Sequence, residues 1–174
     1  MKKHELINVP KGQIKVLLAE DHGAYRKSLK LLVESDANME VIGEARNGRE
    51  AVRLNKCLHP DVIVMDIAMP LMNGLQATQQ IMGSSPKTRV LILSAHPEAE
   101  YIKQAVICGA SGYLIKQSST HVLAQAVREV FEGNAFFCAP IAKPLRDECQ
   151  KLFGKGELLK KRTAQASIFA GTSN

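Results

Sequence analysis

The sequence predicts an α/β protein in which helices cover both faces of a doubly wound, five-stranded parallel sheet. Short apolar runs rich in β-branched residues alternate with longer stretches of helical period, and five such repeats precede residue 135. Three of these runs are apolar without alternation, as strands buried on both faces are. With 174 residues, of which 45% are hydrophobic, the chain can form one domain and a short extension.

Each expected strand is a short apolar segment. The five lie at residues 15–19, 39–43, 62–65, 90–93 and 112–115. The second contains Gly43 and alternates more between polar and apolar residues, so we expect it at an edge of the sheet. Asn47-Gly48 and Asn73-Gly74 are turn signals between elements.

A helix is expected after each strand. Apolar residues at helical spacing mark the first three helices: Tyr25, Leu29, Leu32 and Val33; Ala51, Leu54 and Leu58; and Ala77, Ile81 and Met82. The fourth is expected from about Glu98 to Cys108, with Gly109 as a left-handed stop. The fifth has Ser118 or Ser119 available as its N-cap.

The pattern changes after Gly133. Apolar residues at helical spacing predict an amphipathic C-terminal helix at residues 139–154, and the polar, small and basic residues 155–174 are typical of a mobile tail. We therefore divide the chain into an N-terminal extension (1–13), a main domain (14–138), this helix and this tail. No apolar run approaches the ~18 residues of a membrane span and no signal peptide is evident, so a cytoplasmic protein is expected.

The net charge of +6 is concentrated near the end of the chain. From Ala139 onward seven Lys/Arg residues stand against three Asp/Glu residues, which leaves a net charge of +2 for the preceding residues. The densest run, Lys160-Lys161-Arg162, is more typical of a solvated tail than of a nucleic-acid contact. The four cysteines are far apart and contain no Cys-x-x-Cys pair, so neither a zinc site nor a redox motif is indicated.

Polar and charged residues follow the strands that we expect in the middle of the sheet. Glu20-Asp21 follow the first strand, Asp66 the third, Ser94 the fourth and Lys116 the fifth. In an open parallel sheet, ligands bind beyond the carboxyl ends of the strands, where the strand order reverses. In the order 2-1-3-4-5 the first and third strands are neighbours, so the three carboxylates should lie close together.

Converging carboxylates repel one another, so such a site needs raised pKa values or a bound cation. Of these two ways to relieve the repulsion, binding of a hard divalent cation is the simpler explanation. An all-oxygen site with few protein ligands suits Mg²⁺, which keeps several of its waters and accepts phosphate oxygens. Lys116 could neutralise a further anion, and the hydroxyl of Ser94 could bind one of its oxygens. The residues together predict a site for a phosphoryl group.

These motifs resemble the receiver domains of two-component response regulators. The matching stretches are Leu17-Leu-Ala-Glu-Asp-His22, Val64-Met-Asp-Ile-Ala-Met-Pro70 with Asn73-Gly74, Leu91-Ile-Leu-Ser-Ala-His96, and Gly109-Ala-Ser-Gly-Tyr-Leu-Ile-Lys116. Glu44-Ala-Arg-Asn-Gly-Arg-Glu-Ala51 resembles the subfamily of the nitrate-response and nitrogen-fixation regulators (NarL/FixJ-like). The resemblance runs from residue 14 to about residue 138 and implies a flavodoxin-like sheet.

The resemblance implies phosphoryl acceptance on Asp66. The donor would be a phosphohistidine on a sensor histidine kinase or a phosphotransfer protein. Asp21, Asp66 and the backbone carbonyl of Ala68 would bind Mg²⁺ directly, and Glu20 would act through a coordinated water. The domain would then be a signalling module of a phosphorelay and not an enzyme, beyond self-phosphorylation and autodephosphorylation.

The same resemblance implies a conformational switch. Ser94 and Lys116 would contact the phosphoryl oxygens, and Tyr113 would be an aromatic switch whose rotamer follows Ser94. The switch would alter the surface of the fourth helix, fifth strand and fifth helix, which would then bind a partner protein or form a homodimer. Gln117 stands where many receivers have a proline, so we expect no cis-proline at that bend.

Rival chemistries fit the spacing less well. A haloacid-dehalogenase-type phosphatase needs a second acid two residues after its strand-end aspartate, where this chain has Ala68. A flavodoxin needs a hydroxyl- and glycine-rich phosphate loop after the first strand, where this chain has Glu20-Asp-His-Gly-Ala24. His22 and His96 flank the site but are more typical of solvated loop histidines than of metal ligands.

Two interpretations of the output remain. Regulators of the resembled subfamily usually continue into a helix-turn-helix domain, whereas the 36 residues after Cys138 predict one helix and no complete domain of that kind. The first interpretation is a stand-alone receiver that signals through a protein partner. The alternative is a truncated DNA-binding transcription regulator whose receiver controls dimerisation and DNA binding. In both cases we expect no nucleic-acid binding by this chain alone.

Overall fold

The computed structural model describes residues 12–137, in which strands and helices alternate. The strands are β1 (Ile14–Ala19), β2 (Met39–Ala45), β3 (Val62–Asp66), β4 (Arg89–Ser94), β5 (Gly112–Ile115) and β6 (Phe136–Phe137). The helices are α1 (Gly23–Glu34), α2 (Gly48–Leu58), α3 (Gly74–Ser84), α4 (Ala99–Ile107) and α5 (Ser119–Phe131), with a 3₁₀ turn, η1, at Lys116–Ser118. The predicted C-terminal helix (139–154) and tail (155–174) lie outside the described residues.

All the strands are parallel and follow the order β2-β1-β3-β4-β5-β6. This confirms the predicted fold class and the order of the first five strands. The chain order reverses at β1, which lies between β2 and β3, so the carboxyl ends of β1 and β3 are adjacent. β2 lies at an edge, as its alternating sequence predicts, and has the most mixed burial of the long strands.

The predicted count of five strands is wrong by one, because β6 extends the sheet beyond β5. It contains only Phe136 and Phe137, which is too short to give a strand pattern in the sequence. The Phe136 N–H donates to the carbonyl of Ser111 at 3.2 Å. β6 can lie this close because Gly112 has no side chain: a Cβ there would lie 2.5 Å from the carbonyl oxygen of Phe136.

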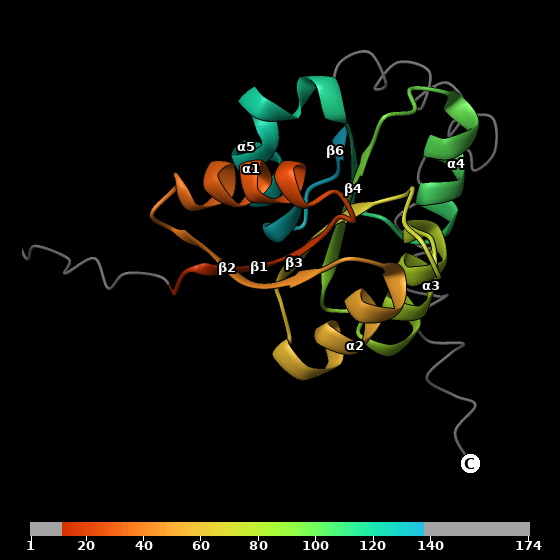
Figure 1. Cartoon of the computed structure of the whole chain (residues 1–174), viewed down its shortest axis with the longest axis horizontal. Coiled ribbons are helices and arrows are strands. Elements are labelled where there is room, and N and C mark those ends of the chain that lie inside the picture. The colour runs from red at the N-terminus through yellow and green to blue at the C-terminus, as the bar shows by residue number, and fades with distance from the viewer. Residues whose placement is uncertain (1–11, 138–174) are drawn as a thin grey trace, which may run out of the picture.

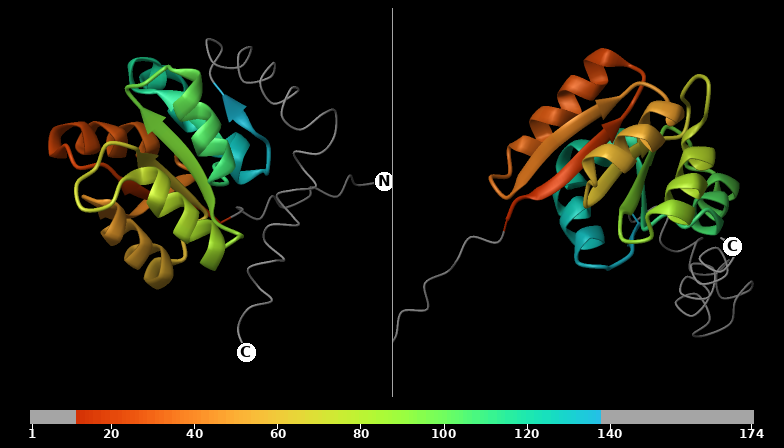
Figure 2. Two further views of the ribbon diagram at one scale, coloured as in Figure 1. Left: turned by 90° about the vertical axis from the view of Figure 1, so that its right-hand side faces the viewer. Right: turned by 90° about the horizontal axis from the view of Figure 1, so that it is seen from below.

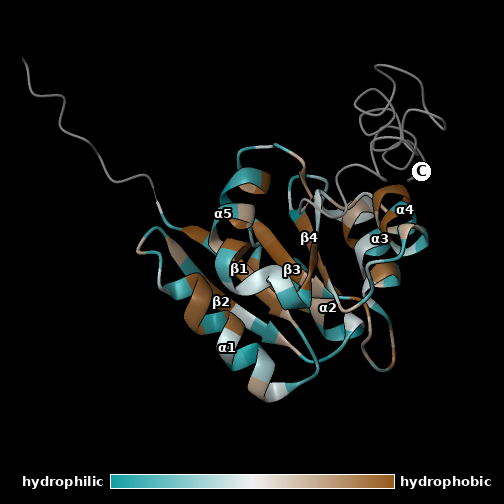
Figure 3. Ribbon diagram, turned by 90° about the horizontal axis from the view of Figure 1, so that it is seen from above, coloured by the Kyte–Doolittle hydropathy of each residue, from teal (hydrophilic) through white to brown (hydrophobic). Residues whose placement is uncertain are grey.

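Helices cover both faces of the sheet. α1 and α5 pack together on one face, and α2, α3 and α4 lie on the other (Figures 1 and 2). The central strands between these layers are strongly apolar (Figure 3), and every residue of β3 and β5 is buried. Each large apolar side chain buried there contributes roughly 1.5–3 kcal/mol. The strand ends therefore project from a well-packed sheet. Across residues 12–137, no helix combines the length and apolar character needed to span a membrane.

The helix ends fix the loops at the carboxyl edge of the sheet. Asn47 and Asn73, predicted as turn residues, are N-caps whose side-chain oxygens accept from the backbone N–H of Glu50 and Gln76, both at 2.9 Å. At the opposite edge, in the loop that leads from α4 into β5, Gly109 adopts the predicted left-handed conformation, with φ +94°.

The start of α5 has a serine at its N-cap, as the sequence predicts, but the side chain of that serine does not cap the helix. Ser118 occupies the N-cap position without a side-chain capping bond. Ser119 is the first residue of the helix, and its hydroxyl instead donates backwards to the carbonyl of Lys116 at 2.8 Å. The turn after β5 therefore folds as the 3₁₀ segment η1, tied to the first residue of α5.

Candidate functional site

Three carboxylates lie together at the carboxyl edge of the sheet. Glu20 and Asp21 follow β1, and Asp66 is the last residue of β3, which pairs with β1 through Ala19 and Met65. One carboxylate oxygen from each acid lies within 4.8 Å of the others. Glu20 and Asp66 are 1% and 3% exposed, whereas Asp21 faces solvent. The structure thus places two buried negative charges beside one that is open to water.

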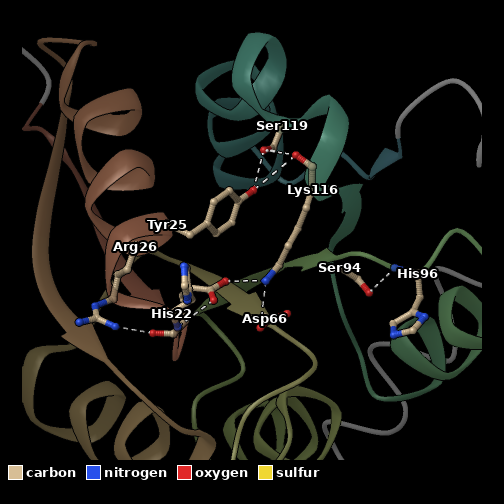
Figure 4. A network of polar contacts seen from close by, with 9 residues as sticks. His22, Tyr25, Arg26, Asp66, Ser94, His96, Lys116 and Ser119 are labelled. Carbon is tan, nitrogen blue, oxygen red and sulfur yellow. Dashed lines mark hydrogen bonds and ion pairs between the residues drawn. The ribbon is translucent and has the colours of Figure 1, made fainter.

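Lys116 places its ammonium group between the two buried carboxylates, and Figure 4 shows its contact with Asp66. Its Nζ lies 2.7 Å from Glu20 Oε2 and 3.1 Å from Asp66 Oδ2. The residue follows β5 and begins η1, so the strand end aims its side chain across the edge of the sheet. One positive charge against three carboxylates leaves a local excess of negative charge.

The pKa values of the two bonded groups reflect this crowding. Burial raises the pKa of Glu20 and the charge of Asp66 adds to the rise, although the hydrogen bond from Lys116 opposes it. Burial acts to lower the pKa of Lys116, but its bonds to Glu20 and Asp66 and their charges outweigh burial and raise it. The lysine therefore stays charged at neutral pH, and the cluster would be stabilised by a further cation.

The donor set fits a hard divalent cation such as Mg²⁺. All the candidate ligand atoms in the cluster are carboxylate oxygens, and the exposure of Asp21 leaves room for the waters that Mg²⁺ retains. Ala68 lies two residues after Asp66, in the exposed part of the loop that follows β3. The cluster does not include His22 or His96, the two histidines that flank the site in the sequence.

Arg26, on α1, holds Glu20 and was not predicted as a site residue. Its Nη1 donates to the backbone carbonyl of Glu20 at 2.6 Å, and its Nε donates to Glu44 Oε2 at 2.9 Å. The Arg26 guanidinium lowers the pKa of Glu44 through this hydrogen bond. The His22 N–H donates to the Glu20 side chain at 3.0 Å, so both the backbone and the carboxylate of Glu20 are fixed. The only signal in the sequence was an arginine at helical spacing to the apolar Leu29 and Val33.

Gly74, the first residue of α3, lies directly against the backbone of Asp66. A Cβ at this glycine would collide with the backbone carbonyl of Asp66, so α3 can begin directly against the end of β3 only with glycine here. The Gly74 N–H donates to the Ile67 carbonyl at 3.0 Å. The loop between them is also tied to α2, because the Gly48 N–H donates to the Met72 carbonyl at 3.0 Å.

Ser94 and Tyr113 meet at one residue of the loop after β4. The buried Ser94 hydroxyl accepts from the His96 N–H at 3.0 Å, and the Tyr113 hydroxyl donates to the His96 carbonyl at 2.7 Å. Tyr113 is fully buried. The His96 ring stacks on Tyr101 of α4, with ring centroids 4.5 Å apart. The backbone of His96 therefore links the end of β4 to β5, and its ring links the same loop to α4.

Tyr25 is a second residue whose contacts the sequence did not reveal. Its helical spacing predicted a place in the apolar stripe of α1. Tyr25 packs against the core as predicted. In addition, its hydroxyl contacts Ser119 and the Lys116 carbonyl, and the Lys116 ammonium lies over its ring (Figure 4).

Comparison with known proteins defines the class. The sequence model of the response regulator receiver domain matches residues 16–128, so the chain belongs to the response regulator receiver family. A curated relative is the transcriptional regulatory protein DegU of Brevibacillus brevis, 33% identical over 149 residues that cover 86% of this chain. The chain spans 63% of the length of that relative.

Solved structures agree with this assignment. A LuxR-family two-component response regulator from Aurantimonas sp. SI85-9A1 superposes with a TM-score of 0.75 at 31% identity, covering 79% of this chain and 98% of that one. The signal receiver domain of the response regulator NarL from Mycobacterium tuberculosis gives 0.69 at 32% identity, covering 71% of this chain and all of that one. The predicted receiver domain and its likeness to NarL-type regulators are confirmed.

Proposed function

We propose that this receiver domain accepts a phosphoryl group on Asp66 in a Mg²⁺-dependent reaction. The observation that carries the proposal is the position of Asp66, a buried strand-end carboxylate whose Oδ2 lies 3.1 Å from Lys116 Nζ and within the Glu20-Asp21-Asp66 cluster. The donor is a phosphohistidine of a sensor histidine kinase or phosphotransfer protein. Phosphoryl acceptance is what the receiver family implies.

In the transfer step, a carboxylate oxygen of Asp66 attacks phosphorus while the P–N bond of the donor breaks. The bonding electron pair returns to the imidazole nitrogen, and the ring leaves as neutral imidazole after taking a proton from solvent. Asp21, Asp66 and the Ala68 carbonyl would hold Mg²⁺ directly and Glu20 would hold it through a coordinated water, and the ion would neutralise the negative charge shared by carboxylate and phosphoryl oxygens.

Lys116 and Ser94 supply the remaining stabilisation. The Lys116 ammonium lies between Glu20 and Asp66, so a small movement brings it to a phosphoryl oxygen on Asp66. The Ser94 hydroxyl accepts from the His96 N–H and so keeps its own proton to donate. Hydrogen bonds to a charged group contribute about 1.5–3 kcal/mol each, enough to favour one conformation by about ten- to a hundredfold apiece.

The same contacts form a conformational switch. When Ser94 turns toward the phosphoryl group, the His96 peptide that it holds moves with it, and Tyr113 is bonded to the other side of that peptide. Because the ring of His96 stacks on Tyr101, a movement of His96 also displaces α4. The surface that changes comprises α4, β5 and α5, with β6 along its edge, and it binds a partner protein or a second copy in the cytoplasm.

A second candidate is a receiver that controls dimerisation and DNA binding of a transcription regulator. It is favoured by the relatives, since DegU is a transcriptional regulatory protein and the chain spans 63% of its length. Sedimentation with and without phosphorylation tests this second candidate: a receiver that controls dimerisation predicts that the phosphorylated chain sediments as a dimer, and unchanged sedimentation would count against it.

Phosphoryl acceptance is tested by intact mass after incubation with acetyl phosphate and Mg²⁺. We expect a Mg²⁺-dependent gain of one phosphoryl group in the unaltered chain and none in Asp66→Asn. Asp61→Asn, directly before the first residue of the same strand and so at its opposite end, is the matched control and should gain as much as the unaltered chain. No gain in the unaltered chain, or an equal gain in Asp66→Asn, would refute the proposal.

A further inference from the structure

The turn that carries Lys116 is held by contacts from another helix. Gln117 follows Lys116, so no proline ring restrains the backbone at this bend. Lys116 also has a long, flexible side chain whose free rotation would direct the ammonium away from Asp66 for much of the time. The structure supplies the restraint from Tyr25, on the first turn of α1 and 91 residues earlier in the chain.

The Tyr25 hydroxyl is anchored to the backbone of this turn. It lies 3.0 Å from the Ser119 Oγ and donates to the Lys116 carbonyl at 3.4 Å. Ser119 is 2% exposed, and its hydroxyl donates to the same carbonyl at 2.8 Å. The three oxygens form one hydrogen-bonded group, which fixes the aromatic ring relative to the backbone of Lys116 (Figure 4).

The Tyr25 ring contacts the other end of the same lysine. The Lys116 Nζ lies 5.0 Å from the ring centroid, within the distance at which a cation is attracted to an aromatic face. The ammonium therefore has the ring as a third neighbour besides Glu20 and Asp66. The ring contact is separate from the two ion pairs that Lys116 makes with the carboxylates.

We infer that Tyr25 is a positioning residue for Lys116: its ring holds the ammonium toward Asp66, and its hydroxyl holds the ring. This inference rests on the proposed function, because it assigns Tyr25 a role in the phosphoryl transfer to Asp66. A charge that is already in position accelerates such a reaction more than a mobile one. The conformational entropy of ordering the side chain is then lost on folding and does not add to the activation free energy of the transfer. Tyr25 touches no reacting atom and acts through Lys116.

The test compares Tyr25→Leu and Tyr25→Phe with the unaltered chain, using acetyl phosphate at saturating Mg²⁺. We expect Tyr25→Leu to accept the phosphoryl group about three- to tenfold more slowly, from loss of the cation–ring contact. Tyr25→Phe keeps the ring but lacks the hydroxyl that holds it, so its rate should lie between those of Tyr25→Leu and the unaltered chain. Mg²⁺ affinity, which depends on the carboxylates, should change less than twofold in both. Leu31→Ala, an exposed position on the same helix, is the matched control.

A spectroscopic readout separates positioning from a general loss of stability. The Lys116 ε-methylene protons should show an upfield ring-current shift in the unaltered chain and in Tyr25→Phe, and lose it in Tyr25→Leu. Tyr25→Leu reacting as fast as the unaltered chain, or an absent ring-current shift, overturns the inference. If the unaltered chain gains no phosphoryl group, the proposed function fails first, and the ring-current shift alone then decides whether Tyr25 holds the lysine.

Discussion

At the scale of single residues, the site is an arrangement of charge that its neighbours keep in place. Glu20 and Asp66 are buried acids that share the ammonium group of Lys116. Their carboxylates repel each other, so other residues must hold their backbones in place. Arg26 supplies this support at the backbone of Glu20, and Gly74 supplies it at the backbone of Asp66. These two supporting residues should therefore be as sensitive to substitution as the acids themselves.

Gly74→Ala tests the support of Asp66. The added Cβ would meet backbone atoms of Asp66 that cannot move without shifting β3 or α3, so we expect a loss of about 1–3 kcal/mol in unfolding free energy. The rate of phosphoryl acceptance should fall as well. Gly83→Ala is the control on the same helix: nothing lies within 4 Å of its added Cβ, and it should be neutral or stabilising by up to about 1 kcal/mol. Equal stability of the two variants in urea would contradict this account.

The ion pair of Arg26 and Glu44 predicts a pH dependence of stability. The folded-state pKa of Glu44 lies below its ordinary value of 4.5, so its stabilisation is complete above that pH and is lost as pH falls through the folded pKa. Glu44→Gln should lower the unfolding free energy at pH 7 by up to about 1 kcal/mol, a small effect because the carboxylate is 36% exposed and screened by solvent.

The unfolding free energies of Glu44→Gln and the unaltered chain should therefore converge as the pH falls below 4.5. Urea unfolding at a series of pH values measures this. Glu40→Gln removes an exposed carboxylate from the same strand and should follow the unaltered chain throughout. A constant difference between Glu44→Gln and the unaltered chain at every pH would contradict the assigned ion pair.

At the scale of elements, the strand ends bring the functional residues together and the helix caps set the loops between them. The sheet interior explains why most of this could be predicted. Unbroken apolar runs such as β3 identify buried parallel strands, and Glu20, Asp66 and Lys116 stand out because each breaks such a run at the same edge.

Other features could not be predicted, because they depend on residues far apart in the sequence. β6 has only two residues, and its place beside β5 depends on the missing side chain of Gly112. Arg26 and Tyr25 have the spacing of ordinary members of an amphipathic helix. Their partners on β2 and on the turn after β5 lie 18 and 91 residues away, respectively, and only the folded chain brings them into contact.

Gly112→Ala tests the position of β6. Its Cβ would lie 2.5 Å from the Phe136 carbonyl oxygen and 2.9 Å from Leu91 Cδ1, so β6 should separate from β5. We expect the Phe136 N–H, bonded to the Ser111 carbonyl in the unaltered chain, to lose its protection from amide exchange. The unfolding free energy should fall by about 1–3 kcal/mol. Unchanged protection of Phe136 would show that β6 does not depend on this close approach.

At the scale of the whole molecule, the fold carries a localised excess of negative charge at one edge of an otherwise apolar sheet. Mg²⁺ binding to this edge should stabilise the folded state, because the unfolded chain has no assembled cluster to bind it. At a free concentration ten times the dissociation constant, the gain is about 1.4 kcal/mol. Thermal unfolding with and without Mg²⁺ measures it. Asp21→Asn and Asp66→Asn should each lose most of the gain, and an undiminished gain in both would place the ion elsewhere.

The most direct test of the central claim is to locate the phosphoryl group. Borohydride reduces an acyl phosphate to an alcohol and so marks the acceptor permanently, and peptide mapping by mass spectrometry after treatment with acetyl phosphate and Mg²⁺ then identifies the marked residue. The account predicts a mark at Asp66 alone, absent without Mg²⁺. A mark at Glu20 or Asp21 instead, or a mark that forms equally without Mg²⁺, would contradict it.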